Sequence, residues 1–171
     1  MSADQIESRV IAVLVDNEPG VLARVIGLFT GRGYNIDSLT VTEVDADQNL
    51  SRITIVTSGT PQVLEQIKAQ LFRLVPIHAV GDLTTGGELV ERELALVKVV
   101  AKGEQRVEAL RIADIFKARV VDAGHGHFVF ELTGKPKKLN SFIELMQPLG
   151  LKDVSRTGVV AIARGPEALG I

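Results

Sequence analysis

The chain has 171 residues, which is enough for one domain or for two small domains of about 80 residues each. Hydrophobic residues make up 46% of the sequence and aromatic residues only 4%, so any core must consist mainly of Val, Ile, Leu and Ala. The net charge of −2 excludes the basic surface expected of proteins that bind nucleic acids or anionic membranes. The absence of cysteine excludes disulfides, thiolate metal sites and cysteine nucleophiles. Because no signal segment or long apolar stretch is present either, we expect a cytoplasmic protein whose partners are small molecules or proteins.

Six elements are predicted in the first half of the chain, in the order strand, helix, strand, strand, helix, strand. The predicted strands are apolar or alternating runs at residues 10–15, 35–44, 53–57 and 75–83. The first helix is predicted from the apolar spacing over residues 21–29, and the second from Thr60 as N-cap followed by Pro61. Each helix has one apolar stripe, and packing both on one face of a four-stranded antiparallel sheet buries the two stripes. The first half therefore predicts an α+β fold with the ferredoxin-like order βαββαβ.

The second half repeats this order after a flexible polar tract at residues 84–88. Its predicted elements are strands at residues 94–101, 120–123, 128–132 and 158–163 and helices at residues 109–116 and 139–146. We therefore predict two tandem ferredoxin-like domains, each with an antiparallel four-stranded sheet and two helices on one face. The predicted boundaries are residues 1–83 for the first domain, 84–93 for the linker and 94–171 for the second domain.

The turn between the first predicted strand and the first predicted helix is the best candidate for a binding site. Asn17 is expected to cap the helix through its side-chain oxygen, and Pro19 suits the helix start because its missing N–H costs nothing there. Gly20 would let a ligand approach the backbone closely. The unpaired N–H groups of Gly20, Val21 and Leu22, together with the helix dipole, suit a small anion such as an amino-acid carboxylate. An ordinary capped turn without a ligand is the alternative.

Two histidines of the second half are a further group of metal-ligand residue types. His125 and His127 flank Gly126 in a predicted turn. A metal site needs a third and usually a fourth ligand, so we expect a solvated hairpin turn rather than a metal site.

An acyl-phosphate hydrolase is a further alternative on the same fold, with a phosphate-binding loop after the first strand. Asn17, Arg24 and Asn35 are residue types that such an enzyme would need. However, Glu18 in the loop would repel phosphate, and Arg24 lies beyond the first helical turn. We therefore predict no catalytic residue in this chain.

Several segments of the sequence resemble the small regulatory subunit of acetohydroxyacid synthase, also called acetolactate synthase. The resembling segments are residues 13–25, 32–41, 50–55, 90–94, 155–158 and 163–165, so the resemblance runs along the whole chain. The first segment by itself resembles only an ACT domain, the module that senses amino acids. The resemblance implies a non-catalytic regulatory chain whose N-terminal ACT domain pairs with its copy in another chain to form a homodimer.

By resemblance, the ACT domains would bind valine, and sometimes other branched-chain amino acids, at the interface between two chains. The residues that the resemblance assigns to this effector site are Asn17, Gly20, Val21, Leu22, Asn35 and Ile36. Asn17 would orient the loop and contact the effector, and the three consecutive amides after Pro19 would bind its carboxylate. Asn35 and Ile36 would complete the pocket from the partner chain, and the apolar side chains would enclose the branched side chain of valine.

The resemblance further implies that the chemistry belongs to a separate catalytic large subunit, which condenses pyruvate into 2-acetolactate with release of CO2 in branched-chain amino-acid biosynthesis. That subunit would contain thiamine diphosphate, magnesium and FAD, and this chain is expected to bind no cofactor. The chain would activate the large subunit, and valine would withdraw the activation or add inhibition. A stand-alone ACT-type amino-acid sensor without an enzyme partner is the alternative.

Overall fold

A computed structural model describes residues 5–169 and divides the chain into two compact units. The first unit extends to Val90 and resumes at Val159, and the second unit spans Glu91–Gly158. The elements of the first unit's βαββαβ motif are β1 (Glu7–Asp16), α1 (Val21–Arg32), β2 (Ser38–Asp45), β3 (Leu50–Gly59), α2 (Pro61–Phe72) and β4 (Ile77–Asp82). They follow the predicted order, and Thr60 caps α2 as predicted by accepting a hydrogen bond from the Val63 N–H.

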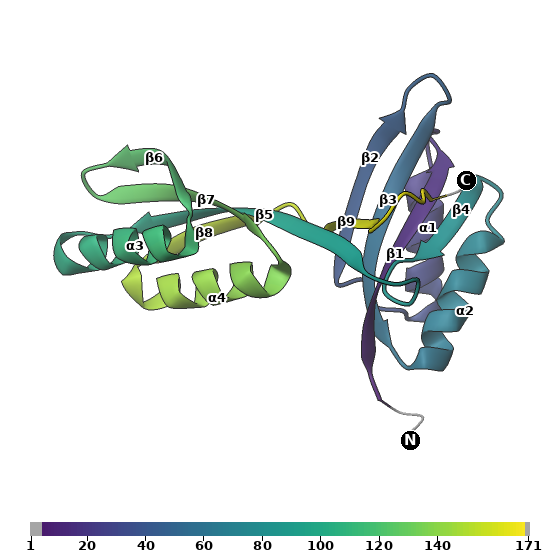
Figure 1. The fold of residues 1–171 in the computed structure, drawn as a ribbon, viewed down its shortest axis with the longest axis horizontal. Coiled ribbons are helices and arrows are strands. Elements are labelled where there is room, and N and C mark those ends of the chain that lie inside the picture. The colour runs from purple at the N-terminus through teal and green to yellow at the C-terminus, as the bar shows by residue number, and fades with distance from the viewer. Residues whose placement is uncertain (1–4, 170–171) are drawn as a thin grey trace. The chain divides into compact units, whose positions relative to one another are not determined.

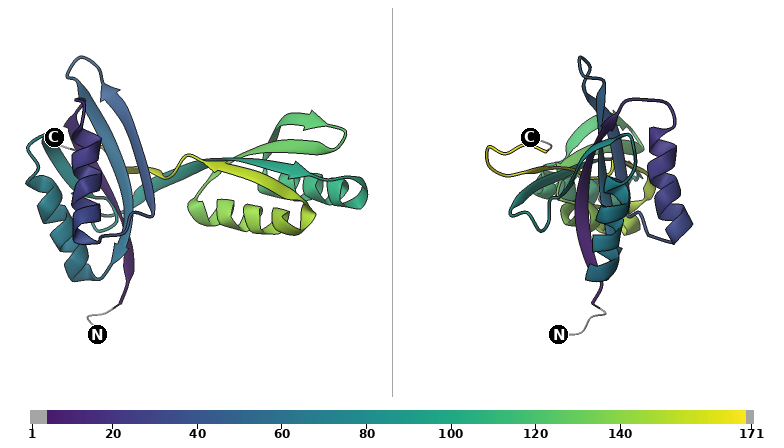
Figure 2. Two further views of the ribbon diagram at one scale, coloured as in Figure 1. Left: turned by 180° about the vertical axis from the view of Figure 1, so that it is seen from behind. Right: turned by 90° about the vertical axis from the view of Figure 1, so that its right-hand side faces the viewer.

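The strands of the first unit form an antiparallel sheet in the order β2-β3-β1-β4, with α1 and α2 on one of its faces (Figures 1 and 2). Successive side chains of a strand point to opposite faces. Ile11, Val13 and Val15 of β1 therefore pack beneath the helices, whereas Val10 and Ala12 lie on the other face. The helix residues buried in this core are Val21, Val25, Phe29, Leu64, Ile67 and Leu71.

The second unit repeats the motif. Its elements are β5 (Leu89–Val100), α3 (Gly103–Phe116), β6 (Arg119–Gly124), β7 (His127–Gly134), α4 (Pro136–Met146), a short 3-10 helix (Gln147–Leu149) and β8 (Leu151–Arg156). The sheet order β6-β7-β5-β8 corresponds strand for strand to that of the first unit, and α3 and α4 lie on one face (Figure 1). Val97, Phe130 and Phe142 are fully buried between this sheet and its helices. The predicted fold class, two tandem ferredoxin-like βαββαβ units, is confirmed.

The prediction for the last strand of the second domain is wrong. The sequence predicts that residues 158–163 complete its sheet as the strand beside β5, but β8 takes that place; β9 (Val160–Ala163) also pairs with β5, off the path β6-β7-β5-β8, and is grouped with the first unit. The apolar signal of β8 is weak, because Leu151 and Val154 are its only apolar residues and its pairing with β5 shifts at a bulge. The sequence pattern therefore places the last strand in the more apolar run that follows β8.

β9 covers the helix-free face of the first unit's sheet. Val159 and Ala161 pack there against Val10 and Ala12. Arg52 Nη2 donates a hydrogen bond of 2.8 Å to the Ala161 carbonyl. The backbone of Val159 is bound on both sides, because its N–H donates to Ser38 Oγ and its carbonyl accepts from Thr40 Oγ1.

The predicted domain boundaries therefore need two corrections. The described residues from Val159 onward belong to the first unit rather than to the second domain. Residues 89–93 of the predicted linker are not a flexible connection, because they form the start of β5. The preceding tract from Thr84 to Glu88 is irregular or turn-like, as its glycines and short polar residues indicate.

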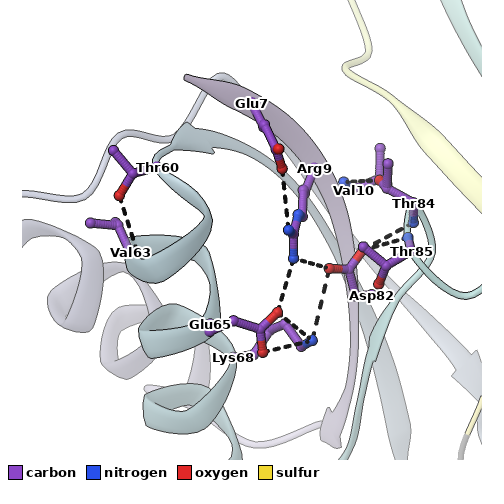
Figure 3. A network of polar contacts seen from close by, with 10 residues as sticks. All are labelled: Glu7, Arg9, Val10, Thr60, Val63, Glu65, Lys68, Asp82, Thr84 and Thr85. Carbon is purple, nitrogen blue, oxygen red and sulfur yellow. Dashed lines mark hydrogen bonds and ion pairs between the residues drawn. The ribbon is translucent and has the colours of Figure 1, made fainter. Parts of the chain in front are cut away.

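Arg9 on β1 is the centre of a polar network that joins three elements of the first unit (Figure 3). Its guanidinium donates to Asp82 at the end of β4 across 3.1 Å and to Glu65 on α2 across 3.0 Å. The Asp82 side chain is only 3% exposed and also accepts two backbone N–H groups of the turn that follows β4. Lys68 on α2 donates to Glu65, so the network ties α2 to the edge of the sheet that is formed by β4.

This network predicts an acid-sensitive contribution to stability. The hydrogen bond from Lys68, and next the one from Arg9, lowers the pKa of the Glu65 carboxyl below its ordinary value. A carboxyl whose pKa is lower in the folded state stabilises that state above its unfolded pKa of about 4.3, and the contribution is lost as the pH falls through the folded value. Glu65→Gln should therefore lose less stability in acid than the wild type does. Urea midpoints of both proteins, measured above and below this pH range, test the difference. Equal acid losses in the two proteins would contradict the prediction.

Candidate functional site

Gly20 sets the geometry of the turn between β1 and α1. It directly precedes the first helical residue and has a φ of +85°, in the left-handed region that favours glycine. Apart from the glycine and its two chain neighbours, no atom of residues 5–169 lies within 4 Å of the position that a Cβ would take, so the turn is open on this side. Among residues 5–169, no acceptor bonds the N–H groups of Gly20 and Leu22, whereas the Val21 N–H donates to the Glu18 carbonyl across 3.4 Å. Two of the three predicted amide donors are therefore available to a ligand.

Asn17 does not cap α1, contrary to the prediction. The N-cap residue is Gly20, and Asn17 and Pro19 both precede it. An N-cap side chain bonds amides of the first helical turn directly after it, and Asn17 lies three residues too early for that. Instead, Asn17 Nδ2 donates to Glu43 Oε1 on β2 across 3.1 Å, and the Asn17 N–H donates to the Asn49 carbonyl across 2.8 Å. Asn17 thus ties the turn to the hairpin formed by β2 and β3.

The apolar residues of the predicted site differ in accessibility. Val21 is 4% exposed and its side chain belongs to the core of the first unit, so it does not enclose a ligand as expected. Leu22 is 38% exposed, and Ile36 is half-buried against the same core. Leu22 and Ile36 are therefore the two predicted apolar residues that can contact a ligand side chain.

Asn35 and Ile36 lie at the opposite end of the sheet from the turn. Asp16, which precedes the turn, pairs with Leu50 of β3, whereas Ser38, which follows residues 35 and 36, pairs with Val56. The β3 residues of these two pairs are six positions apart, which corresponds to roughly 20 Å along a strand. The predicted site residues therefore form two separate groups within one chain.

The loop before β2 is fixed by side-chain hydrogen bonds. Asn35 Nδ2 donates to Asp37 Oδ1, and the other carboxylate oxygen of Asp37 accepts from Ser58 Oγ. Thr57 Oγ1 donates to the Asn35 carbonyl across 2.6 Å. Sequence reasoning missed Asp37 and Glu43 as partners of the two asparagines. The spacing of Asp37 two residues after Asn35 was an available signal, but Glu43 meets Asn17 only through strand register.

The structure does not bring together the residues of the acyl-phosphate hydrolase alternative. Asn17 and Asn35 lie at opposite ends of the sheet, so within one chain they cannot act with Arg24 on one phosphate. A surface groove of about 440 Å³ is lined by Glu65, Lys68, Ala69, Phe72, Arg73 and Val80, and it contains none of the predicted site residues.

The histidine pair lies at a hairpin, with His125 in the turn and His127 as the first residue of β7. His125 is exposed in the turn between β6 and β7, and His127 Nε2 forms a hydrogen bond of 2.8 Å with Asp122 Oδ2. Within residues 5–169, no group of three or more His, Cys, Asp or Glu side chains is placed to bind a metal ion. In the same part of the chain, no helix is long and apolar enough to span a membrane.

Comparison with protein families gives two adjacent matches. A family model described as an AHAS small subunit-like ACT domain matches residues 11–79, which cover most of the first unit's βαββαβ motif. A second model, described as the small subunit of acetolactate synthase, matches residues 92–165, which cover the second unit and β9.

Individual relatives match nearly the whole chain. A probable acetolactate synthase small subunit from Archaeoglobus fulgidus is 48% identical over 155 residues, which cover 91% of this chain and 96% of the relative. The acetolactate synthase isozyme 3 small subunit of Escherichia coli is 43% identical and covers 94% of this chain and 98% of its own. The crystal structure of the small subunit from Thermotoga maritima superposes with a TM-score of 0.83 at 34% identity, covering 94% of this chain and 99% of its own. The chain therefore belongs to the family of acetolactate synthase small subunits, which are regulatory rather than catalytic, and its N-terminal unit is an ACT domain.

Proposed function

We propose that this chain activates a catalytic large subunit of acetolactate synthase and makes that subunit sensitive to valine. The observation that carries the proposal is the turn at Gly20, which presents unpaired amide donors at the N-terminus of α1 in an ACT domain of this family. In this proposal the large subunit binds thiamine diphosphate, magnesium and FAD and forms acetolactate from pyruvate. The small subunit contributes only the effector site and the contact through which valine binding affects the large subunit.

The arrangement of β2 supports an effector site between two copies of the chain. β2 is an edge strand with an exposed Val41, and an edge strand of this kind favours pairing with another strand. If two copies pair antiparallel through β2, the Ser38 end of one strand lies beside the Asp45 end of the other. Residues 35 and 36 of one chain then approach the turn at residues 17–22 of the other. This pairing would unite the two groups of predicted site residues.

The chemistry of the combined site suits a branched-chain amino acid. The Gly20 and Leu22 amides and the dipole of α1 would bind the carboxylate. The amide oxygens of Asn17 and Asn35 would accept hydrogen bonds from the ammonium group, and Leu22 would contact the side chain. One methylene changes binding by about 1–3 kcal/mol, so valine, isoleucine and leucine should bind with different affinities.

Regulation requires that valine favour one arrangement of the assembly over another. The coupling free energy equals the difference in the affinity of valine for the two arrangements, typically about 1–3 kcal/mol. By reciprocity, the bound large subunit must change the affinity of the small subunit for valine by the same factor. Measuring valine affinity with and without the large subunit therefore measures the coupling directly.

A stand-alone amino-acid sensor is the remaining alternative. It shares the effector site but predicts no effect on a large subunit. Adding the purified chain to its large subunit and measuring acetolactate formation separates the two functions. An increase in turnover that valine reverses supports the regulatory function, and unchanged turnover favours the stand-alone sensor.

Calorimetric titration of the purified chain with valine is the direct test of the effector site. We expect saturable binding of valine, weaker binding of isoleucine or leucine, and no binding of lysine, whose charged side chain would be desolvated in an apolar pocket. Asn17→Ala should weaken valine binding by roughly tenfold, because one hydrogen bond to a charged group is lost. Undiminished valine binding by this variant would remove the turn from the proposed site.

A further inference from the structure

A site made only of amide donors and an apolar wall would not distinguish valine from other small carboxylates. The 2-oxo acid with the same carbon skeleton has the same carboxylate and the same branched side chain as valine, but it has no ammonium group. The helix N-terminus would bind the carboxylates of both compounds equally. On the proposed function, on which this inference rests, selectivity for the amino acid therefore requires acceptors that are oriented toward the ammonium group.

Both asparagines of the site donate a side-chain hydrogen bond to a carboxylate, although they lie in different loops. Asn17 Nδ2 donates to the carboxylate of Glu43, and Asn35 Nδ2 donates to the carboxylate of Asp37. An ionised carboxylate only accepts hydrogen bonds, so each contact requires the amide NH2 group and fixes which side of the amide faces away. Between residues 5 and 169, neither Asn Oδ1 receives a hydrogen bond. Both amide oxygens are therefore unpaired acceptors with a defined orientation.

The fold also holds the carboxylates of Glu43 and Asp37 in place. Glu43 lies on β2 on the same face of the sheet as Leu39, which packs against the helix-side core, so it points toward the start of α1. Asp37 is fixed by Ser58 Oγ and by its own N–H, which donates to the Val56 carbonyl across 2.8 Å. Neither carboxylate needs to touch the ligand to orient its asparagine.

We propose that Glu43 and Asp37 are positioning residues that turn the amide oxygens of Asn17 and Asn35 toward the ammonium group of the effector. The pair makes the site specific for amino acids over 2-oxo acids of the same shape. This selectivity matters for a subunit of an enzyme whose substrates are 2-oxo acids, because the effector site would otherwise bind the substrate class as well as the end product. Without Glu43, the Asn17 amide can rotate and present its NH2 group, which repels an ammonium group.

The test compares the binding of valine and of its 2-oxo acid analogue to the full-length chain by calorimetry. Glu43→Ala should weaken valine binding roughly tenfold and leave the affinity for the 2-oxo acid unchanged, so the selectivity ratio falls by the same factor. Glu43→Gln offers the Asn17 amide both an acceptor and a donor, so it fixes the amide orientation less firmly and should also lower the ratio. Asp37→Ala should lower the same ratio.

Glu18→Ala is the matched control, because it removes a carboxylate from the same turn that has no side-chain hydrogen bond in the described part of the chain. It should leave the ratio unchanged, and thermal unfolding confirms that each variant is folded.

The outcomes separate the inference from the proposed function. If the wild type binds valine and Glu43→Ala binds it equally well, the positioning role is wrong and the effector site stands. An equal loss of both ligands in Glu43→Ala also overturns the role, because it indicates a general disturbance of the turn. If the wild type binds no valine at all, both the effector site and the inference fail.

Discussion

Gly20→Asp is expected to abolish the response to valine while the chain remains folded. Gly20 is the N-cap of α1, and aspartate is among the residues that cap helices best, because its carboxylate accepts from the amides of the first turn. The new carboxylate would therefore occupy the donors that the proposed site offers to the carboxylate of valine. Its negative charge would also repel that carboxylate at short range. Valine affinity should fall by roughly a hundredfold or more, and valine should no longer reduce acetolactate formation by the complex.

The cost of this substitution to stability should be small. The φ of +85° at Gly20 strains a side chain by about 1–2 kcal/mol, although aspartate tolerates the left-handed region better than most residues. In the described part of the chain, nothing but the residue itself and its chain neighbours lies within 4 Å of the new Cβ, so no steric clash is added. The favourable interaction of the carboxylate with the helix N-terminus, typically about 0.3–1 kcal/mol, offsets part of the strain.

Gly103→Asp is the matched control for this experiment. Gly103 also has a positive φ, of +60°, and open space around a Cβ, and it lies at the start of α3 in the second unit. The variant reproduces the backbone strain and the added charge at a helix N-terminus that is outside the proposed site. It should retain valine binding and inhibition. A loss of valine response in both variants, or in neither, would contradict the assignment of the effector carboxylate to the Gly20 turn.

The order of elements was predictable because it depends on local signals. Thr60 and Pro61 mark the start of α2 by the chemistry of the N-cap and the first helical position, and both have the predicted roles. The apolar run at residues 10–15 predicted the first strand, and β1 spans this run. These signals need no knowledge of distant parts of the chain.

The place of β9 was not predictable from such signals. Its apolar residues cover Val10 and Ala12, which precede them by about 150 positions in a chain of 171 residues. Nothing in the local pattern of residues 159–163 distinguishes a strand that completes one sheet from a strand that covers another. The neighbouring β8 escaped prediction for the opposite reason, since its sequence is mostly polar and its pairing contains a bulge.

The candidate site also combines features that local sequence predicts with a contact that it does not predict. The open amides at Gly20 follow from local sequence, because a glycine before a helix leaves the first N–H groups without partners. The contact between the Asn17 side chain and Glu43 does not follow from local sequence, because it depends on the register between β2, β3 and β1. The burial of Val21 was visible in the apolar stripe of α1, so its side chain could have been assigned to the core from the sequence alone.

Arg9→Met is expected to lower the free energy of unfolding by about 3 kcal/mol, the largest stability effect that we predict. The Asp82 carboxylate is 3% exposed, and Arg9 is its closest cationic partner at 3.1 Å, whereas Lys68 Nζ lies 3.9 Å away (Figure 3). Removing Arg9 leaves a buried charge with incomplete compensation, which costs more than the loss of an exposed ion pair. The two backbone N–H groups that Asp82 accepts place the effect at the lower end of the range for such pairs. Urea denaturation at neutral pH measures the change.

Two further proteins distinguish an uncompensated charge from a mere loss of packing. Asp82→Asn keeps a side-chain oxygen for the turn but removes the charge, so the double variant Arg9→Met/Asp82→Asn should be more stable than Arg9→Met alone. Arg111→Met is the matched control, because its ion pair with Glu108 on α3 is exposed, with the arginine side chain 62% accessible. That control should cost less than about 1 kcal/mol. If Arg9→Met and Arg111→Met lose the same stability, the network around Asp82 contributes no more than a surface ion pair, because burial is the feature that separates the two arginines.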